Sequence, residues 1–394
     1  MVLSNSQTSP TWKHTASSLV AHGFLFVSGV SLVWALLSFV YHPNPNFETF
    51  KTNPNLCYDP PQTTFYDDPH LSYDIERPMK DWDMKRREWF KHHPSFNAGL
   101  RNRILIVTGS QPSKCQNQVG DHLLLRLFKN KVDYSRLHGY DIFYNNALLH
   151  PKMTGFWAKY PLIRAAMLAH PEAEWIWWID SDAMFTDMEF KIPLERYENH
   201  NLVVHGWKHL IYSKQSWTSV NAGVFLMRNC QWSMDFMQAW ASMGPQTQNY
   251  DKWGRIQKST FKDKMFPQSD DQSALIYLLL NKNERAKWED KIYVESEYSL
   301  SGYWLGIVDD LTNERGAELM MGDCRGAVGS WRRPFVTHFT GCEPCSGDHN
   351  PMYTWEACWK GMLKALNFAD NQVLSTFGFV HPDLLNSSWV SRRA

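Results

Sequence analysis

The stretch WIWWIDSDAMF, from Trp175 to Phe185, decides the fold of this chain. Its first five residues are bulky, apolar and strand-forming. This pattern predicts a strand that is buried on both faces, as in a parallel sheet. The run ends abruptly in Asp180-Ser181-Asp182. Two carboxylates at the end of a buried strand are costly to desolvate unless a cation or a hydrogen-bond network compensates them.

Asp180 and Asp182 predict a metal site. Residues i and i+2 of an extended segment point the same way, so the two carboxylates can reach one ion. Hard oxygen ligands suit Mg²⁺ or Mn²⁺, and these ions commonly keep coordination positions open for substrate phosphates. For an Asp-x-Asp taken alone, a turn with two solvated acids is the better interpretation. The apolar run before it reverses that preference.

The segments before this strand alternate between strand and helix. Residues 103–110 (RILIVTGS) predict a buried strand and a Gly-Ser turn, and 140–144 predict a second strand. Helical spacing covers 119–131 and about 155–168. This order predicts an α/β fold with a mostly parallel, Rossmann-like sheet and the Asp-x-Asp at a strand's carboxyl end, where such sheets bind ligands. No GxGxxG follows Ser110, so dinucleotide binding is not supported.

Further strands are predicted over 201–206, 219–227 and 334–341, and a helix over 231–243. Asp270, Asp271 and Gln272 precede an apolar run and therefore stand at a helix N-terminus, where the helix dipole favours acids. Helix capping and a functional role are equally good interpretations there. His338 is either a core residue or a third metal ligand, and Gly341 would let the backbone approach a phosphate.

The N-terminal residues predict a membrane anchor. Residues 19–41 are apolar, and about 20 such residues span a bilayer. A cleaved signal peptide is the alternative, but its apolar region would be shorter. We therefore expect a type II membrane protein with a cytosolic tail (1–18), an anchor (19–41), a stem (42–98) and a lumenal catalytic domain (99–394). Within the stem, DWDMKRREWFKHHPSF predicts a short helix that ends before Pro94.

Charge and cysteine content narrow the class of protein. Lys and Arg number 40 against 40 Asp and Glu, so there is no electrostatic case for nucleic-acid binding. The seven cysteines are expected to form disulfides with one left over. Cys342 and Cys345 have no second CxxC to complete a zinc site, so disulfides with Cys358 or Cys324 are favoured. The sequon at Asn386 fits a secretory context.

Several stretches together resemble one plant family, the Golgi xyloglucan xylosyltransferases and galactomannan galactosyltransferases. The resemblance covers most of residues 100–385 and includes VTGSQPSKC (107–115), GFWAKYPLIR (155–164), WWIDSDAMFTDMEFKIPLERY (177–197), HGW (205–207), NAGVFLMRNCQWSMDFMQAWASMGP (221–245), DDQSALIYLL (270–279), SGYW (301–304) and THFTGC (337–342). It implies a GT-A fold, a UDP-sugar donor, a divalent metal and retention of configuration at the transferred sugar.

The resemblance also implies residue roles. Asp180, Asp182 and His338 would hold Mn²⁺ against the donor diphosphate. Residues near the nucleotide and donor sugar would be Gly109, Ser110, Lys159, Ser181, Asn221, Ala222, Gly223 and Gly341. Asp270 and Asp271 would face the donor sugar and acceptor, with Gln272 close to the anomeric carbon. An amide is a poor nucleophile, so a front-side reaction in which the departing phosphate takes the acceptor proton is favoured over double displacement.

Two branches of this family differ at position 343. The xylosyltransferases carry a lysine that contacts the diphosphate, whereas this chain has Glu343, which cannot donate a hydrogen bond to phosphate. The segments WASMGPQTQNYDKWG (240–254) and STFKDKMFP (259–267) also resemble the galactomannan branch. The region 305–331 matches neither branch clearly.

We therefore expect a Golgi type II, Mn²⁺-dependent retaining glycosyltransferase that adds α-1,6-galactose from UDP-galactose to a β-mannan. The closest alternative is α-1,6-xylosylation of a β-glucan from UDP-xylose. Two further alternatives are a non-catalytic scaffold in a complex with other glycosyltransferases and a secreted metal-dependent hydrolase. Metal-dependent UDP binding separates the enzyme from the scaffold, and the nature of the acceptor separates the transferase from the hydrolase.

Overall fold

The computed structural model describes residues 68–96, 103–311 and 334–393. The predicted anchor (19–41) and the unmatched region around Cys324 lie outside these residues. Among the residues described, no helix is both long enough and apolar enough to cross a bilayer.

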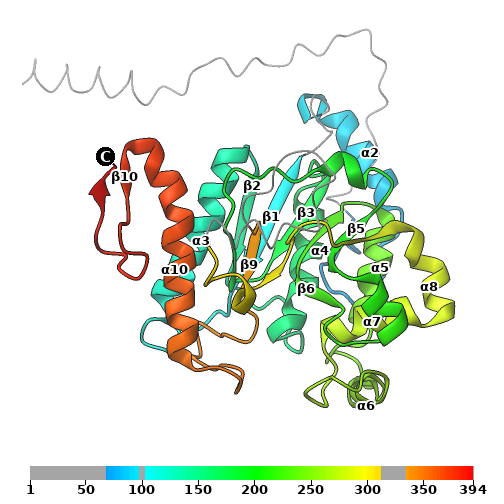
Figure 1. The fold of residues 1–394 in the computed structure, drawn as a ribbon. Helices are drawn as coiled ribbons and strands as arrows, with labels where there is room; N and C mark the ends of the chain where they lie inside the picture. The colour runs from blue at the N-terminus through cyan, green and yellow to red at the C-terminus, as the bar shows by residue number, and fades with distance from the viewer. Residues whose placement is uncertain (1–67, 97–102, 312–333, 394) are drawn as a thin grey trace, which may run out of the picture. The chain divides into compact units, whose positions relative to one another are not determined.

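A mixed six-stranded sheet forms the centre of the domain (Figure 1). Its strands, in spatial order, are β2 (Asp141–Asn145), β1 (Ile104–Gly109), β3 (Trp175–Ile179), β6 (Val220–Arg228), β5 (Leu202–Gly206) and β7 (Ile292–Glu295). The pairs β1–β2, β1–β3 and β5–β7 are parallel. Strand β6 runs antiparallel to both of its neighbours, which the sequence pattern did not predict. The α/β class is confirmed, and the sheet is less uniformly parallel than expected.

Helices cover both faces of this sheet. Their bounds are α2 (Trp82–His92), α3 (Gly120–His138), α4 (Lys159–Ala169), α5 (Gln231–Ala241), α6 (Tyr250–Thr260), α7 (Asp271–Leu280), α8 (Lys282–Trp288) and α10 (Trp355–Leu374). Short helical turns are η2 (Pro94–Phe96), η3 (Gly155–Ala158), η4 (Leu194–Tyr197), η5 (Leu210–Lys214), η6 (Glu289–Lys291), η7 (Trp304–Gly306) and η8 (Ser375–Phe377).

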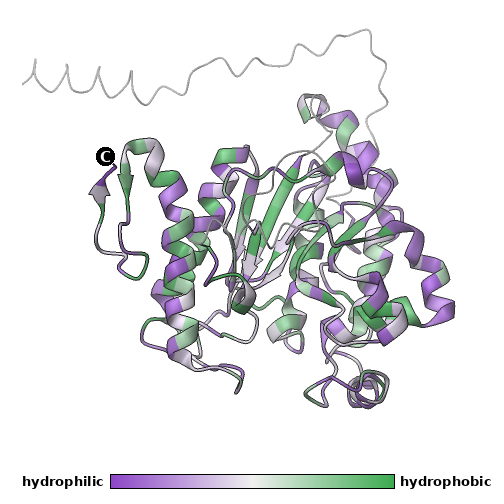
Figure 2. Cartoon of the chain, viewed as in Figure 1, coloured by the Kyte–Doolittle hydropathy of each residue, from purple (hydrophilic) through white to green (hydrophobic). Residues whose placement is uncertain are grey.

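Alternate residues of the central strands feed two apolar cores. In β3, Ile176 and Trp178 belong to the core that α2, α4, α5 and α7 cover. Trp175, Trp177 and Ile179 belong to the core that α3 and α10 cover. All five residues are buried, as the apolar run predicted, and hydrophobic residues run along strands of the sheet (Figure 2).

Two small sheets complete the domain. One contains β4 (Ala183–Phe185), β9 (Val336–His338) and β8 (Gly302–Tyr303), in that order. It packs into the same core as α3 and α10. The other pairs β10 (Phe379–Val380) with β11 (Ser391–Arg392) in a C-terminal hairpin beside α10 (Figure 1).

Part of the segment expected as a stem packs on the domain. Helix α2 ends before Pro94, as predicted, but its Trp82 is fully buried. The Trp82 indole donates a hydrogen bond of 2.7 Å to Asn229, and its backbone N–H donates one of 2.7 Å to Gln231. The described residues 68–96 are therefore part of the compact unit that extends to the C-terminus.

Two disulfides hold the loop that follows β9, one to helix α10 and one to the loop that follows β1. Cys342 pairs with Cys358, one of the two partners expected for the CxxC. Cys345 pairs with Cys115 instead, because the loop after β9 returns to the loop after β1, 230 residues earlier in the chain. Cys230 is a free thiol.

Candidate active site

Asp180, Asp182 and His338 form one cluster, here called the metal cluster. One ligand atom from each lies within 4.8 Å of the others. The His338 Nε2 lies 3.3 Å from Asp182 and 3.9 Å from Asp180. Two carboxylates and one imidazole are a donor set that suits Mn²⁺, so the residues present fit a divalent ion.

The two aspartates meet through a turn and not through strand pleating. Strand β3 ends at Ile179 and β4 begins at Ala183, with Asp180, Ser181 and Asp182 between them. The Ala183 backbone N–H donates to the Asp180 carbonyl over 3.1 Å, which closes the turn. The expectation that an extended i, i+2 spacing aligns the carboxylates was therefore wrong. Pairing of Ala183 with His338 across β4 and β9 brings the imidazole to them.

Gly223 leaves the space that this cluster needs. A Cβ at this position would collide with the His338 ring and stand 2.6 Å from an Asp180 carboxylate oxygen. The Gly223 carbonyl accepts a hydrogen bond of 2.8 Å from the Asp180 backbone. Strand β6 therefore approaches the cluster closely because this residue has no side chain.

Polar neighbours orient the His338 ring. Its Nδ1 lies 3.1 Å from the Asn221 amide oxygen and 3.2 Å from the Ser301 hydroxyl. Ser301 itself donates to Asn221 over 2.8 Å. This leaves Nε2 facing the two carboxylates. An outer partner on the second ring nitrogen is the usual arrangement for a metal-ligating histidine.

The charges of the cluster are strongly coupled. Burial opposes protonation of His338, but the charges of Asp182 and Asp180 raise its pKa above the ordinary value. Burial likewise opposes ionisation of Asp182, yet the charge and hydrogen bond of His338 lower its pKa. For Asp180, burial outweighs the opposing charge of Lys159 and raises the pKa. A further cation at this place would compensate the buried negative charge.

Lys159 connects the metal cluster to the N-terminus of α7. Its side chain is 2% exposed, and its Nζ lies 2.7 Å from Asp271 and 3.3 Å from Asp180. It also donates to the Ala222 carbonyl over 2.9 Å. The charges of the two aspartates raise the pKa of Lys159 against the opposing effect of burial, so the lysine is charged.

Asp270 caps α7. Its carboxylate accepts hydrogen bonds from the backbone and hydroxyl of Ser273 and forms an ion pair with the buried Lys264. The Trp217 indole also donates to it over 3.3 Å. The capping interpretation is therefore confirmed for Asp270.

The Gln272 amide is held at both ends. Its Nε2 donates to the Trp217 carbonyl over 2.8 Å, and its Oε1 accepts from the Ala222 backbone over 3.4 Å. Asp271, Gln272 and the Asn221–Gly223 segment are thus brought together with the metal cluster. The roles expected of them stay predictions.

The residues expected beside the nucleotide lie in neighbouring loops. Ser110 follows β1, and its hydroxyl lies 2.6 Å from the Tyr144 hydroxyl. A Cβ at Gly109 would collide with the Asn145 carbonyl. Gly341 has φ of +79°, in the left-handed region that favours glycine, and follows His338 by three residues. The Ser181 carbonyl accepts a hydrogen bond of 3.3 Å from Lys131.

Glu343 follows the Gly341 turn. Its side chain accepts a hydrogen bond of 3.1 Å from Ser346, and its backbone N–H bonds the Asp348 carbonyl. Tyr353 packs against the turn by donating to the Thr340 carbonyl over 2.6 Å.

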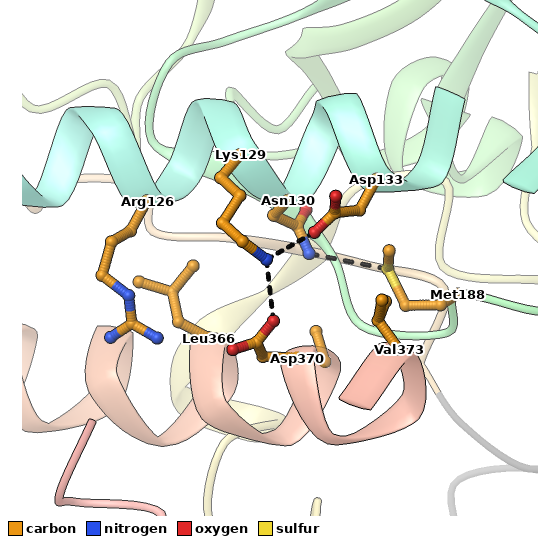
Figure 3. Close-up of a pocket in the computed structure, with 9 residues that line it drawn as sticks. Arg126, Lys129, Asn130, Asp133, Met188, Leu366, Asp370 and Val373 are labelled. Atoms are coloured by element: carbon orange, nitrogen blue, oxygen red, sulfur yellow. Dashed lines mark hydrogen bonds and ion pairs between the residues drawn. The ribbon is translucent and has the colours of Figure 1, made fainter. Parts of the chain in front are cut away.

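The structure places two features outside this cluster. Asn386 is exposed on the C-terminal hairpin, where a sequon asparagine is accessible. A small pocket lies between α3 and α10, where Lys129 bridges Asp133 and Asp370 (Figure 3). None of the predicted site residues lines that pocket.

Sequence reasoning missed four residues that make polar contacts within the site. Trp178 donates its indole N–H to Asp180 over 2.6 Å, and Ser301 orients both Asn221 and His338. Lys264 neutralises Asp270, and Trp217 binds Gln272. Trp178, Lys264 and Ser301 each lie in a stretch that carries the family resemblance, but the resemblance gave none of them a role. Trp217 lies outside those stretches, and its contact is with Gln272, 55 residues away.

Comparison with known proteins gives curated relatives over nearly the whole chain. The chain is 54% identical to galactomannan galactosyltransferase 1 of Cyamopsis tetragonoloba, covering 96% of this chain and 95% of the relative. It is 54% identical to glycosyltransferase 6 of Arabidopsis thaliana, covering 94% of each, and 51% identical to putative glycosyltransferase 7 of that plant, covering 98% of this chain and 95% of the relative. The resemblance seen in the sequence is confirmed.

Solved structures are much more distant. A glycosyltransferase involved in glycosylation of the PBCV-1 major capsid is 13% identical, with a TM-score of 0.37, and the match covers 61% of this chain and 94% of that chain. The galactosyltransferase LgtC is also 13% identical, with a TM-score of 0.31 and coverage of 66% and 95%.

A family model matches residues 101–349, which include the metal cluster, Lys159 and the N-terminus of α7. Its description is the galactosyl transferase GMA12/MNN10 family. With relatives above 50% identity over more than nine-tenths of their length, the chain is a glycosyltransferase and belongs to the galactosyl transferase GMA12/MNN10 family.

Proposed function

We propose that this chain is a retaining, metal-dependent galactosyltransferase that transfers galactose from UDP-galactose to a β-mannan backbone, forming an α-1,6 linkage. The observation that carries the proposal is the metal cluster beside the Asn221–Gly223 segment and Gln272. The identity of 54% with a galactomannan galactosyltransferase supports the choice of galactose and mannan.

The metal cluster would bind Mn²⁺, and the bound ion would offset negative charge that develops on the departing diphosphate. Lys159 is a fixed positive charge next to it, buried and held by Asp180 and Asp271. A charge that is already fixed in a site that excludes water can stabilise the transition state without first having to reorient. The backbone turn at Gly341 would approach the phosphates, and Gly109 and Ser110 would line the nucleotide pocket.

The restrained amide of Gln272 supports a front-side reaction. Its two ends bind Trp217 and Ala222, so it is fixed in place but offers no carboxylate nucleophile. In this reaction the bond from the anomeric carbon to the phosphate oxygen breaks, and the acceptor hydroxyl oxygen bonds to the same face. The hydroxyl proton passes to the departing phosphate oxygen. Galactose therefore keeps its α configuration.

Glu343 bears on the choice of donor. A carboxylate repels phosphate and cannot donate a hydrogen bond to it, so the contact that a lysine makes in the xylosyltransferase branch is not available here. The side chain is instead bonded to Ser346 within its own turn. This supports galactosyl over xylosyl transfer.

We further propose a Golgi location, with the chain anchored as a type II protein by residues 19–41 and its catalytic domain in the lumen. The disulfides Cys115–Cys345 and Cys342–Cys358 support an oxidising compartment, because cytosolic thiols are kept reduced. The exposed sequon at Asn386 is compatible with the same compartment.

The test crosses two donors with two acceptors. The purified full-length chain is supplied with Mn²⁺, either UDP-galactose or UDP-xylose, and either mannohexaose or cellohexaose, and the products are analysed by mass spectrometry and NMR. We expect an α-1,6-galactosyl product on mannohexaose. Xylosyl transfer to cellohexaose would instead assign the chain to xyloglucan synthesis, and release of free galactose at the same rate with and without acceptor would indicate a hydrolase.

A further inference from the structure

The connection between β5 and β6 carries two tryptophans, Trp217, which restrains Gln272, and Trp207, to which the proposed reaction gives no role. We call residues 207–219 the tryptophan loop, after Trp207 and Trp217 near its two ends. The Trp207 backbone N–H donates to the Ser219 carbonyl over 2.9 Å, which closes the base of the loop. The loop therefore projects from strands that are paired up to its first and last residues.

Trp217 fixes one end of this loop to the N-terminus of α7. Its indole N–H donates to Asp270, and its carbonyl accepts the hydrogen bond from Gln272. The Asp263 carboxylate accepts the Trp217 backbone N–H at 2.9 and 3.1 Å. The tryptophan loop is thus joined to the residue expected near the anomeric carbon.

Strand pairing places His205, two residues before the other end of the loop, on the same face as Asn221. His205 of β5 stands opposite Asn221 of β6, and opposed residues of an antiparallel pair project to one face. Asn221 contacts His338. Trp207 follows His205 by two residues and lies just beyond the end of β5. The two rings are in contact, with centroids 5.0 Å apart and planes at 70°.

His205 gives Trp207 a rigid support. It is 7% exposed, and burial lowers its pKa to about 4, so the imidazole is neutral at the pH of the secretory pathway. The neutral His205 ring holds the Trp207 indole in place through an edge-to-face contact. Because it carries no charge, it does not attract an ionic ligand. Asn221, His205 and Trp207 are therefore successive neighbours that connect the metal cluster to an aromatic ring of fixed orientation.

Trp207 is unusual in its exposure. Among the tryptophans that the structure describes, only Trp207 (39%) and Trp389 (53%) are exposed, and Trp389 belongs to the C-terminal hairpin. A tryptophan that is exposed beside a catalytic site, and held there by a buried neighbour, offers a flat apolar surface of fixed orientation to a ligand.

We propose that Trp207 is the stacking platform for the β-mannan acceptor, with its ring against the C–H face of a pyranose, and that His205 is a positioning residue beneath it. The proposal rests on the proposed function, since it assumes a neutral glycan acceptor. Such an acceptor has no charge for an ion pair, so its recognition depends on ring stacking and on hydroxyl hydrogen bonds. The link through Trp217 to Gln272 would hold the stacked chain beside the transferred galactose.

The experiment compares Trp207→Ala, the conservative Trp207→Phe and the control Trp389→Ala in the full-length chain. Acceptor KM is measured with mannohexaose at saturating UDP-galactose, and donor KM at saturating mannohexaose. We expect Trp207→Ala to raise acceptor KM about three- to tenfold, in line with the usual strength of an aromatic contact. Donor KM and the unfolding temperature should stay the same. Trp207→Phe should recover most of the loss, and Trp389→Ala should behave as the unchanged protein.

Equilibrium binding separates this inference from the proposed function. Mannohexaose and cellohexaose are titrated into each variant in the presence of UDP and Mn²⁺, with tryptophan fluorescence or calorimetry as the readout. Even if no sugar is transferred, weaker mannohexaose binding by Trp207→Ala alone supports the platform. The inference is overturned if Trp207→Ala binds mannohexaose as tightly as the unchanged protein, if acceptor and donor KM rise together with a loss of stability, or if the unchanged protein binds mannohexaose no better than cellohexaose.

Discussion

The ammonium group of Lys159 lies 2.7 Å from a carboxylate oxygen of Asp271 and is almost fully buried with it. The same ammonium lies 3.3 Å from Asp180, so one lysine joins the metal cluster to the first turn of α7. The positive charge of Lys159 offsets the repulsion between two acidic segments, 91 residues apart in the chain at positions 180 and 271. It also makes the lysine a point at which stability and activity can be tested together.

Replacing Lys159 with Met should destabilise the domain. Removing one partner of a buried ion pair leaves an uncompensated charge, at a cost of about 3–5 kcal/mol in the free energy of unfolding. Denaturant unfolding of the full-length chain measures this cost, and Lys152→Met at an exposed lysine is the control. Equal stabilities of the two variants would show that the carboxylates of Asp180 and Asp271 do not depend on Lys159.

Gly223→Ala should weaken metal binding. The added methyl group would collide with the His338 ring and approach Asp180, so the three ligands could no longer converge. We expect Mn²⁺ affinity to fall by about 10- to 100-fold, the range seen when partners of a metal site are lost. The control is Gly306→Ala, where a Cβ meets nothing within 4 Å. Unaltered Mn²⁺ binding by Gly223→Ala, read from electron paramagnetic resonance, would argue against the cluster as the metal site.

Loss of the Cys115–Cys345 disulfide should destabilise the domain more than loss of the free thiol. The bond links positions 230 residues apart, so it restricts the unfolded chain strongly, by about 5 kcal/mol in the chain-entropy account. The double variant Cys115→Ser and Cys345→Ser is compared with Cys230→Ser by denaturant unfolding. If the double variant is no less stable than Cys230→Ser, this disulfide does not stabilise the domain.

The pair of His170 and Glu172 should give a small pH-dependent stability. The side chains lie 3.0 Å apart, and this hydrogen bond raises the pKa of His170 above its ordinary value of 6.5. The stabilisation is therefore full below pH 6.5 and is lost as the pH rises through the folded-state pKa. Because His170 is 39% exposed, solvent screens the pair, and we expect about 0.5 kcal/mol or less.

The measurement for this pair is the free energy of unfolding of the unchanged protein minus that of His170→Gln, taken between about pH 6 and pH 8. The difference should shrink as the pH rises. Glu172→Gln in place of His170→Gln should give the same trend. A difference in the free energy of unfolding that grows with pH would contradict this account.

Local patterns predicted much of the fold. The apolar run of β3, the strand and Gly-Ser turn of β1, and the acids that begin α7 were visible because each depends on neighbouring residues. The antiparallel direction of β6 was not visible, since strand direction depends on how distant segments pair. The burial of Trp82 was missed for a similar reason, because the contacts of α2 are with Asn229 and Gln231, far along the chain.

Local patterns likewise predicted some residues of the candidate site and missed others. Asp180 and Asp182 could be found from the strand that precedes them, although their convergence depends on a turn that the spacing did not predict. His338 on its own was an ambiguous histidine, and only the family resemblance singled it out. Its position follows from pairing with Ala183, 155 residues earlier, which no local pattern encodes. The contact of Trp217 with Gln272, 55 residues away, is equally invisible to local patterns.

The most direct test of the central claim is a calorimetric titration of UDP into the full-length chain, with Mn²⁺ and again with excess EDTA, alongside Asp182→Asn. The account predicts binding with Mn²⁺, loss of that binding with EDTA, and the same loss for Asp182→Asn when Mn²⁺ is present and the unfolding temperature is unchanged. Equal UDP affinity under all three conditions would contradict a metal-dependent donor site at Asp180, Asp182 and His338. No UDP binding under any condition would favour a scaffolding role.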